Sequence, residues 1–174
     1  DQAHVEQQSG SRLVGTQRCT RACAAGSPVR FLNDGIGMEY EVAGPRTGVP
    51  VGLIHGFPFN RHMWKPQVGE LKQHHYVVTY DIRGFGESDA GDGQYSVEYF
   101  VDDLISLLDH LRIPRAVAAG LSMGGYIALR AIERHPDRFR GLILADTRSE
   151  PDTNEGKVKR AEQARSLKKE GMKK

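Results

Sequence analysis

The segment Gly120-Leu121-Ser122-Met123-Gly124 constrains the fold of this chain more than any other feature of its sequence. A short apolar run at 116–119 precedes it, and a run with helical spacing at 126–133 follows it. A serine with glycines two positions before and after it, between a buried strand and a helix, is typical of a sharp strand-to-helix turn. Such a turn has no room for side chains at Gly120 and Gly124, and it holds the serine hydroxyl above a helix N-terminus, where negative charge is favoured. The pattern predicts an α/β fold with an exposed nucleophile, Ser122.

Two earlier segments have a similar organisation. An apolar run at 51–54 leads into His55-Gly56-Phe57-Pro58, and another at 76–80 leads into Asp81-Ile82-Arg83-Gly84-Phe85-Gly86. Each combines a short buried strand with a glycine-containing loop. The glycines after Arg83 do not form a dinucleotide-binding fingerprint, because Asp89 stands where its third glycine would be and no helix opens there. We expect Asp81 and Arg83 to tie this loop down.

The order of these three motifs resembles the α/β-hydrolase superfamily, over roughly residues 37–148. The segments 120–129 and 145–148 look like its small serine esterase and enol-lactonase group. The resemblance implies a serine hydrolase that acts on small carboxylic esters or lactones through an acyl-enzyme at Ser122, without cofactor or metal. A serine argues against the haloalkane dehalogenase and epoxide hydrolase branches, which use a carboxylate there. Cofactor-free perhydrolases share the same nucleophile elbow and remain an alternative.

The resemblance also implies roles for residues around Ser122. In this family the oxyanion hole consists of two backbone N–H groups, which here are those of Phe57 and Met123. His55 and Gly56 belong to the supporting loop, and we expect His55 to hold its shape rather than act as the base, since it precedes the nucleophile. Asp146 follows the last predicted strand and is either a triad acid or a turn residue.

The general-base histidine is absent from the expected positions. His135 is the only histidine after Ser122, and a helix that rises 1.5 Å per residue places it about 20 Å away. We therefore expect a C-terminally truncated hydrolase with about six of the roughly eight strands of its fold. The alternatives are a non-catalytic fragment, or complementation by a second chain that supplies the missing part. An exposed sheet edge would then favour self-association.

The remaining pattern predicts a mostly parallel, doubly wound sheet that begins with an antiparallel hairpin. The expected elements are a hairpin strand at 38–42 after the turn 33–35, a helix over 60–73 capped by Asn60, a helix from Ser96 that ends before Pro114, and a last strand at 141–145.

Three regions differ in composition. Residues 1–27 lack a clear period and are predicted to be a flexible leader. A zinc site needs four ligands, so Cys19 and Cys23 are expected to be free thiols, with a single disulfide between them as the alternative. Residues 28–148 are the predicted core. Residues 149–174 are predicted to begin the lid region as a basic helix, since the tail from 151 holds eight Lys or Arg and four Asp or Glu.

The charge pattern gives little support to macromolecular partners. The net charge is +2, and we interpret the basic tail as a solvated helix face rather than a site for nucleic acid or a membrane surface. No window is apolar enough for a membrane span. The absence of cysteine from the core weakly favours a cytoplasmic protein.

Overall fold

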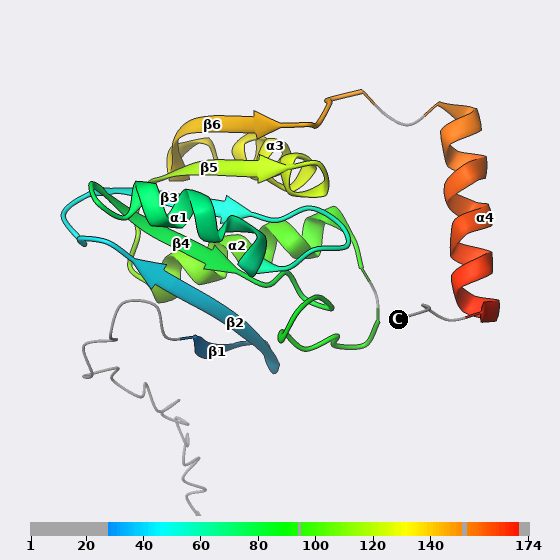
Figure 1. The fold of residues 1–174 in the computed structure, drawn as a ribbon, viewed down its shortest axis with the longest axis horizontal. Helices are drawn as coiled ribbons and strands as arrows, with labels where there is room; N and C mark the ends of the chain where they lie inside the picture. The colour runs from blue at the N-terminus through cyan, green and yellow to red at the C-terminus, as the bar shows by residue number, and fades with distance from the viewer. Residues whose placement is uncertain (1–27, 94, 151–152, 171–174) are drawn as a thin grey trace, which may run out of the picture.

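The computed structural model describes residues 28–93, 95–150 and 153–170 of the 174-residue chain (Figure 1). The strands are β1 (Val29–Asn33), β2 (Ile36–Ala43), β3 (Val49–Ile54), β4 (His75–Tyr80), β5 (Ala116–Leu121) and β6 (Phe139–Ala145). The helices are the 3-10 helix η1 (Arg61–Trp64), α1 (Lys65–Leu71), α2 (Val97–His110), α3 (Met123–Arg134), the 3-10 helix η2 (Pro136–Arg138) and α4 (Asn154–Glu170). The predicted leader, with its two cysteines, lies outside the described residues.

The six strands form one mixed sheet in the order β1-β2-β4-β3-β5-β6. β1 pairs antiparallel with β2, and β2 pairs antiparallel with β4. The other neighbours, β4, β3, β5 and β6, are parallel. The predicted α/β class, with its antiparallel hairpin and six strands, is confirmed. Asp34 and Gly35 form the two-residue hairpin turn, and both have positive φ, as the primed turns of tight hairpins require.

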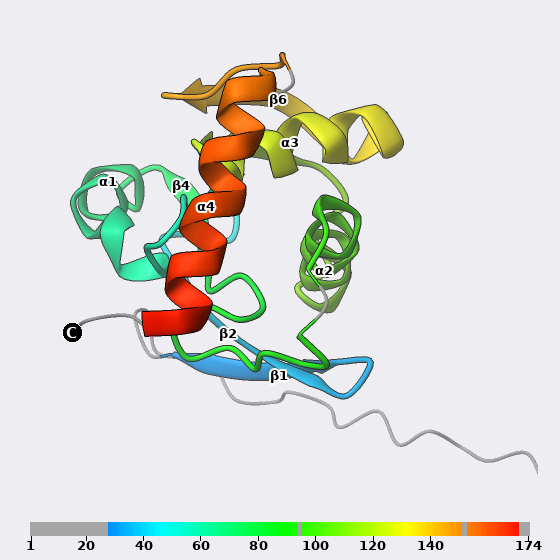
Figure 2. The same ribbon diagram turned by 90° about the vertical axis from the view of Figure 1, so that its right-hand side faces the viewer.

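Helices cover the sheet on both faces. α1 lies on one side, and α2 and α3 lie together on the other (Figure 2). The larger core, around Met38, Ile54 and Leu107, fills the space between the sheet and α2 and α3. The smaller core surrounds Trp64 and Leu53 on the side of α1. Because the central strands are buried on both faces, they read in the sequence as continuous apolar runs.

The chain changes winding direction between β3 and β5. After β3 it passes through α1 to β4 on one side, whereas after β5 it passes through α3 to β6 on the other. The loops that follow these two adjacent parallel strands therefore diverge to opposite faces of the sheet. In doubly wound sheets this switch point opens a crevice at the carboxyl ends of the strands, where ligands bind.

Two predicted helix starts are confirmed by their caps. The Ser96 side chain accepts a hydrogen bond from Tyr99 N–H at the start of α2. Asn60 accepts one from His62 N–H, but the single helix expected over 60–73 is divided into η1 and α1. Pro66 stands in the first turn of α1 and has no N–H to continue an α-helix from η1, so the second helix begins there instead.

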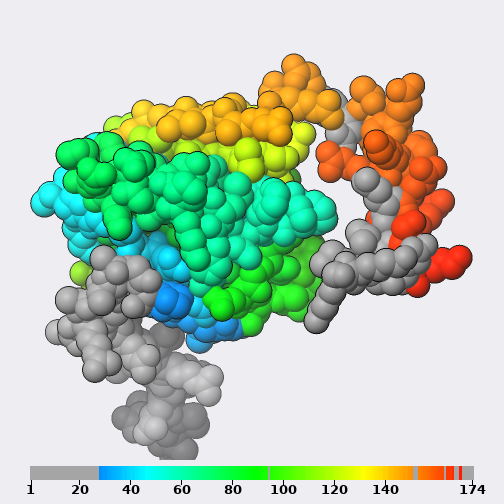
Figure 3. All heavy atoms as spheres, in the orientation of Figure 1, coloured from blue at the N-terminus to red at the C-terminus, as the bar shows by residue number. Residues whose placement is uncertain are grey.

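The C-terminal part of the described chain differs from the rest. α4 stands apart from the sheet in Figure 1, and Figure 3 shows its atoms outside the packed body. Val158 is 58% exposed. β6 is an edge strand on which Ile143 and Leu144 are exposed. Whether α4 begins a lid and whether β6 mediates self-association stay predictions. No helix within the described residues is long and apolar enough to cross a membrane.

Candidate active site

Ser122 occupies the strained turn between β5 and α3. Its φ of 49° and ψ of −110° are rare for a residue with a side chain. A Cβ at Gly120 would lie 2.2 Å from the carbonyl oxygen of Gly124, and one at Gly124 would lie 2.2 Å from the carbonyl oxygen of Ile54. Only glycine fits at either position, because these backbones already touch. The crowding on both sides of the turn is what the sequence pattern predicted for these two glycines.

The Ser122 side chain is left available by its surroundings. Serine at a helix N-cap often accepts a hydrogen bond from the first turn, but Ser122 makes no such bond to α3. It is half-buried. The Met123 N–H lies in the first turn of α3, where backbone donors have no partner within the helix. The turn thus presents a hydroxyl and a free amide next to the positive end of a helix dipole.

The loop after β3 passes directly beside this hydroxyl. Ile54 pairs with Gly120 at the ends of their strands, so the two following loops begin side by side. A Cβ at Gly56 would lie 3.1 Å from the carbonyl oxygen of Leu121 and 3.4 Å from the Cβ of Ser122, so the loop backbone passes close beside the elbow. Phe57 comes next, is 58% exposed, and within the described residues its N–H donates no hydrogen bond. The structure therefore brings the predicted oxyanion-hole residues to the switch point beside Ser122.

His55 connects this loop to the one after β4. It is fully buried, its Nε2 accepts a hydrogen bond from Ile82 N–H at 3.0 Å, and its Nδ1 lies 3.1 Å from the carbonyl oxygen of Gly56. Both contacts are satisfied together when Nδ1 carries the proton and the ring is neutral. Burial lowers the pKa of His55. With both nitrogens engaged, His55 has no lone pair to offer Ser122.

This geometry predicts that the protein loses stability in mild acid. Unfolded, His55 has a pKa near 6.5, whereas in the fold the value is lower. Above pH 6.5 His55 is neutral in both states. As the pH falls below 6.5, His55 binds a proton in the unfolded state but stays neutral in the folded state. This difference favours unfolding until the pH reaches the pKa of the folded state. The loss is at most about 1.4 kcal/mol per pH unit. Urea unfolding at several pH values should give a steeper decline for the wild type than for His55→Gln, and equal slopes would contradict the assignment.

Arg61 is the centre of a buried ion cluster that the sequence did not reveal. Its guanidinium pairs with Asp81, with Glu41 at 3.0 Å and with Glu87 at 2.5 Å, and its N–H donates to Asp81 at 2.7 Å. Asp81 is fully buried and also accepts from Glu87 N–H. Burial would lower the pKa of Arg61, but the hydrogen bonds that its guanidinium donates to Glu87 and Glu41, with the nearby carboxylate charges, outweigh burial and raise the pKa. The cluster joins β2, the segment after the loop of Phe57 and the loop after β4.

Arg83 forms a second buried pair, on the side of α2. It donates two hydrogen bonds of 2.6 Å to the carboxylate of Asp103, which also accepts from Asn33. Its guanidinium lies 5.1 Å from the centre of the Tyr99 ring. Asp81 and Arg83 therefore anchor the loop 81–88, as expected, but through partners that are distant in the sequence.

Asp146 and His135 occupy different surroundings. Asp146 is exposed, has a φ of 45°, and makes no hydrogen bond or ion pair with another described residue. Its acid role stays a prediction. His135 ends α3, so the length of that helix, about 18 Å, separates it from Ser122. Within the described ranges, the candidate nucleophile and the two candidate amides lie together, and no histidine hydrogen-bonds to the Ser122 side chain.

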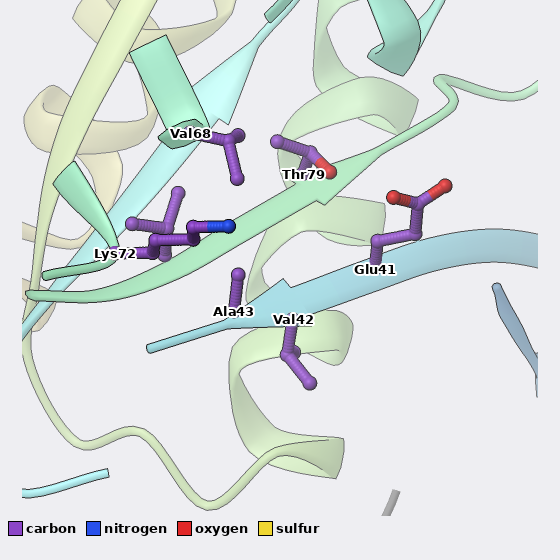
Figure 4. A pocket seen from close by; sticks show the side chains of 7 residues that line it. Glu41, Val42, Ala43, Val68, Lys72 and Thr79 are labelled. Atoms are coloured by element: carbon purple, nitrogen blue, oxygen red, sulfur yellow. The ribbon is translucent and has the colours of Figure 1, made fainter. Parts of the chain in front are cut away.

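A shallow hollow of about 110 Å³ lies elsewhere, on the side of α1 (Figure 4). It is lined by Glu41, Val42, Ala43, Val68, Lys72, Val77 and Thr79. None of these residues belongs to the loops that follow β3 and β5, so the hollow is separate from the candidate site. Across the described ranges, no group of His, Cys, Asp or Glu is arranged to hold a metal ion.

The family follows from the agreement between this geometry and known proteins. A family model described as the alpha/beta hydrolase fold matches residues 49–166. The chain belongs to the α/β-hydrolase fold family. The match includes all three motifs on which the resemblance rests, so that interpretation is confirmed for the family as a whole.

Relatives within this α/β-hydrolase family catalyse several hydrolytic reactions. The chain is 35% identical over 112 residues to 3-oxoadipate enol-lactonase 2 of Acinetobacter baylyi, covering 64% of this chain and 42% of that protein. It is 35% identical over 118 residues to epoxide hydrolase 4 of Mus musculus, covering 67% and 33%. A solved structure of a thermophilic esterase from Thermogutta terrifontis matches with a TM-score of 0.75 and 41% identity, covering 83% and 54%. The chain thus spans about half, or less, of the length of these relatives.

Proposed function

We propose that this chain carries the nucleophile and oxyanion hole of a serine hydrolase acting on small carboxylic esters or lactones. The observation that carries the proposal is the position of Ser122, strained and uncapped at the start of α3, with Gly56 against its Cβ. Serine at this turn favours acyl transfer over epoxide opening, because a serine forms an acyl-enzyme whereas the epoxide hydrolase branch of the resembled family needs a carboxylate. The esterase and enol-lactonase among the relatives support the same substrate class.

In the proposed reaction, the Ser122 Oγ attacks the carbonyl carbon of the substrate and its proton passes to a base. The carbonyl oxygen becomes an oxyanion that the amides of Phe57 and Met123 stabilise, and removing one such donor typically costs about 100 to 1000-fold in turnover. The tetrahedral intermediate then collapses and breaks the bond between the carbonyl carbon and the alkoxy oxygen, which takes the proton from the base and becomes an alcohol. The acyl group remains on Ser122. Water hydrolyses this ester, releases the acid and regenerates the serine.

The base is the part of the reaction that the described residues do not supply. His55 is engaged through both ring nitrogens, and His135 lies at the far end of α3. This observation favours a second candidate function for the 174-residue chain itself, a hydrolase scaffold without turnover. In the whole protein, we propose that a base from outside the described residues completes the site, with Asp146 as a candidate acid partner.

Acyl trapping distinguishes the two candidates. The folded chain is mixed with p-nitrophenyl acetate, quenched in acid within seconds and digested, and the acetylated peptides are identified by mass spectrometry. We expect acetyl on the peptide that contains Ser122, in excess over exposed lysines, because the hydroxyl is held beside two oxyanion donors. The urea-unfolded chain is the control. Equal labelling of Ser122 in both samples would contradict the proposal, and Ser122 acylated without release of further product would favour the scaffold.

A further inference from the structure

The end of β6 and the loop after it are hydrogen-bonded to the turn that contains Ser122. Ser122 N–H donates to the carbonyl oxygen of Ala145 at 2.9 Å. Asp146 then adopts a φ of 45°, a strained turn that brings the next residue back over the elbow. The hydroxyl of that residue, Thr147, donates to the carbonyl oxygen of Ser122 at 2.9 Å. A segment about twenty-five positions away in the sequence therefore binds both the N–H and the carbonyl group of Ser122.

Thr147 also rests on the first turn of α3. A Cβ at Gly125 would lie 2.5 Å from both the Cγ2 and the Oγ1 of Thr147, so the threonine side chain occupies the space that a side chain at 125 would need. Gly125 N–H donates to the same Ser122 oxygen at 2.9 Å, and Tyr126 N–H approaches it at 3.4 Å. The Ser122 carbonyl is thus fixed by three donors, of which Thr147 is the one that comes from outside the elbow.

The fixed carbonyl determines the direction of the oxyanion donor. The C=O of Ser122 and the N–H of Met123 belong to one planar, trans peptide unit, in which they point in opposite directions. A bond that holds the carbonyl in place therefore also aims the Met123 N–H. The ψ of Ser122, −110°, is strained, so the peptide would relax to another orientation without such a restraint.

We propose that Thr147 is a positioning residue that aims the Met123 N–H at the oxyanion through its hydrogen bond to the Ser122 carbonyl. The proposal rests on the proposed function, in which that amide binds the oxyanion. Thr147 touches neither substrate nor oxyanion, and its role is to keep a strained peptide in the reactive orientation. The hydroxyl carries the role, and the methyl group fills the space above Gly125.

Three substitutions separate the hydroxyl from the methyl group. Thr147→Val keeps the shape and removes the hydrogen bond, Thr147→Ser keeps the bond and removes the methyl, and Thr147→Ala removes both. Thr47→Val, at an exposed threonine in the loop between β2 and β3, is the matched control. The rate constant for acetylation of Ser122 by p-nitrophenyl acetate at saturation should fall about 10-fold in Thr147→Val and Thr147→Ala, part of what a lost oxyanion donor costs. Thr147→Ser should stay within about 3-fold of the wild type, with the half-saturating ester concentration unchanged.

A second readout does not depend on activity. Gly125 and Tyr126 donate to the carbonyl that Thr147 holds, so their amide hydrogens should exchange faster in Thr147→Val than in Thr147→Ser, at equal Tm. If the wild type does not acetylate at Ser122, the proposed function fails for this chain, and exchange alone decides the role of Thr147. The proposal would be overturned if Thr147→Val acetylated at the same rate as the wild type and its amide hydrogens exchanged at the same rate. It would also be overturned if Thr147→Ser were as defective as Thr147→Ala. This second comparison remains informative if Thr147→Val does not fold.

Discussion

Replacing Ser122 with alanine is expected to reduce p-nitrophenyl acetate and butyrate hydrolysis by the chain to the background rate. Only one oxygen atom is lost, and it is the atom proposed to attack. The strained turn and the amides of Phe57 and Met123 remain, so substrate binding should persist while acyl transfer stops. In a protein that also supplies the general base, removing the nucleophile costs about 10⁶-fold in kcat. Release of p-nitrophenol, followed by absorbance, measures the effect.

The comparison needs a serine that is not at the elbow. Ser166 is exposed on α4, and Ser166→Ala should leave hydrolysis unchanged. Turnover by the wild-type chain that vanishes in Ser122→Ala would mean that a base reaches the serine, and would exclude the scaffold without turnover. Equal background rates in the wild type and Ser122→Ala would instead favour the scaffold without turnover.

The elbow and the loop after β3 were predictable because their constraints come from local residue type and from the regular pairing of parallel strands. Gly120 is required by a backbone contact within the turn itself, whereas Gly124 is required by the backbone of Ile54 at the end of β3. The strand and helix around Ser122 have clear periodicity. Parallel strands bring the ends of β3 and β5 to the same edge, so Gly56 could be expected near the serine from topology alone. Each of these features follows from local residue type or from the pairing of β3 with β5, and both can be predicted from the pattern of strands and loops.

The residues that hold the elbow and loops in place were not predictable in the same way. In the sequence, Arg61 is one charge in a polar helical segment, and only the fold brings β2 and the loop after β4 around it. Thr147 has no signal beyond its place after a strand. Asp103 is an acidic position on a helix whose other face is apolar. Such contacts join segments twenty or more positions apart, and periodicity carries no information on them.

Removing the Arg61 guanidinium is expected to have the largest effect on stability. Arg61→Met preserves the length and most of the apolar volume of the side chain but leaves Asp81 fully buried without its cation. Glu41 and Glu87 would then face Asp81 as like charges. Breaking a buried pair in this way costs about 3–5 kcal/mol, a large part of the 5–15 kcal/mol that typically stabilises a domain. Urea unfolding, followed by fluorescence of Trp64, the single tryptophan of the chain, measures the loss.

Charge and geometry make separate contributions to this cluster. Arg61→Lys keeps a cation but not the planar fork whose three nitrogens reach three carboxylates, so its loss should be intermediate. Arg30→Met removes an exposed arginine that also pairs with two carboxylates, and its effect should be much smaller because water screens such pairs. If Arg61→Met lost no more stability than Arg30→Met, burial would not be the cause. Because η1 follows the loop of Phe57, the cluster that stabilises the fold also anchors the chain directly after that loop.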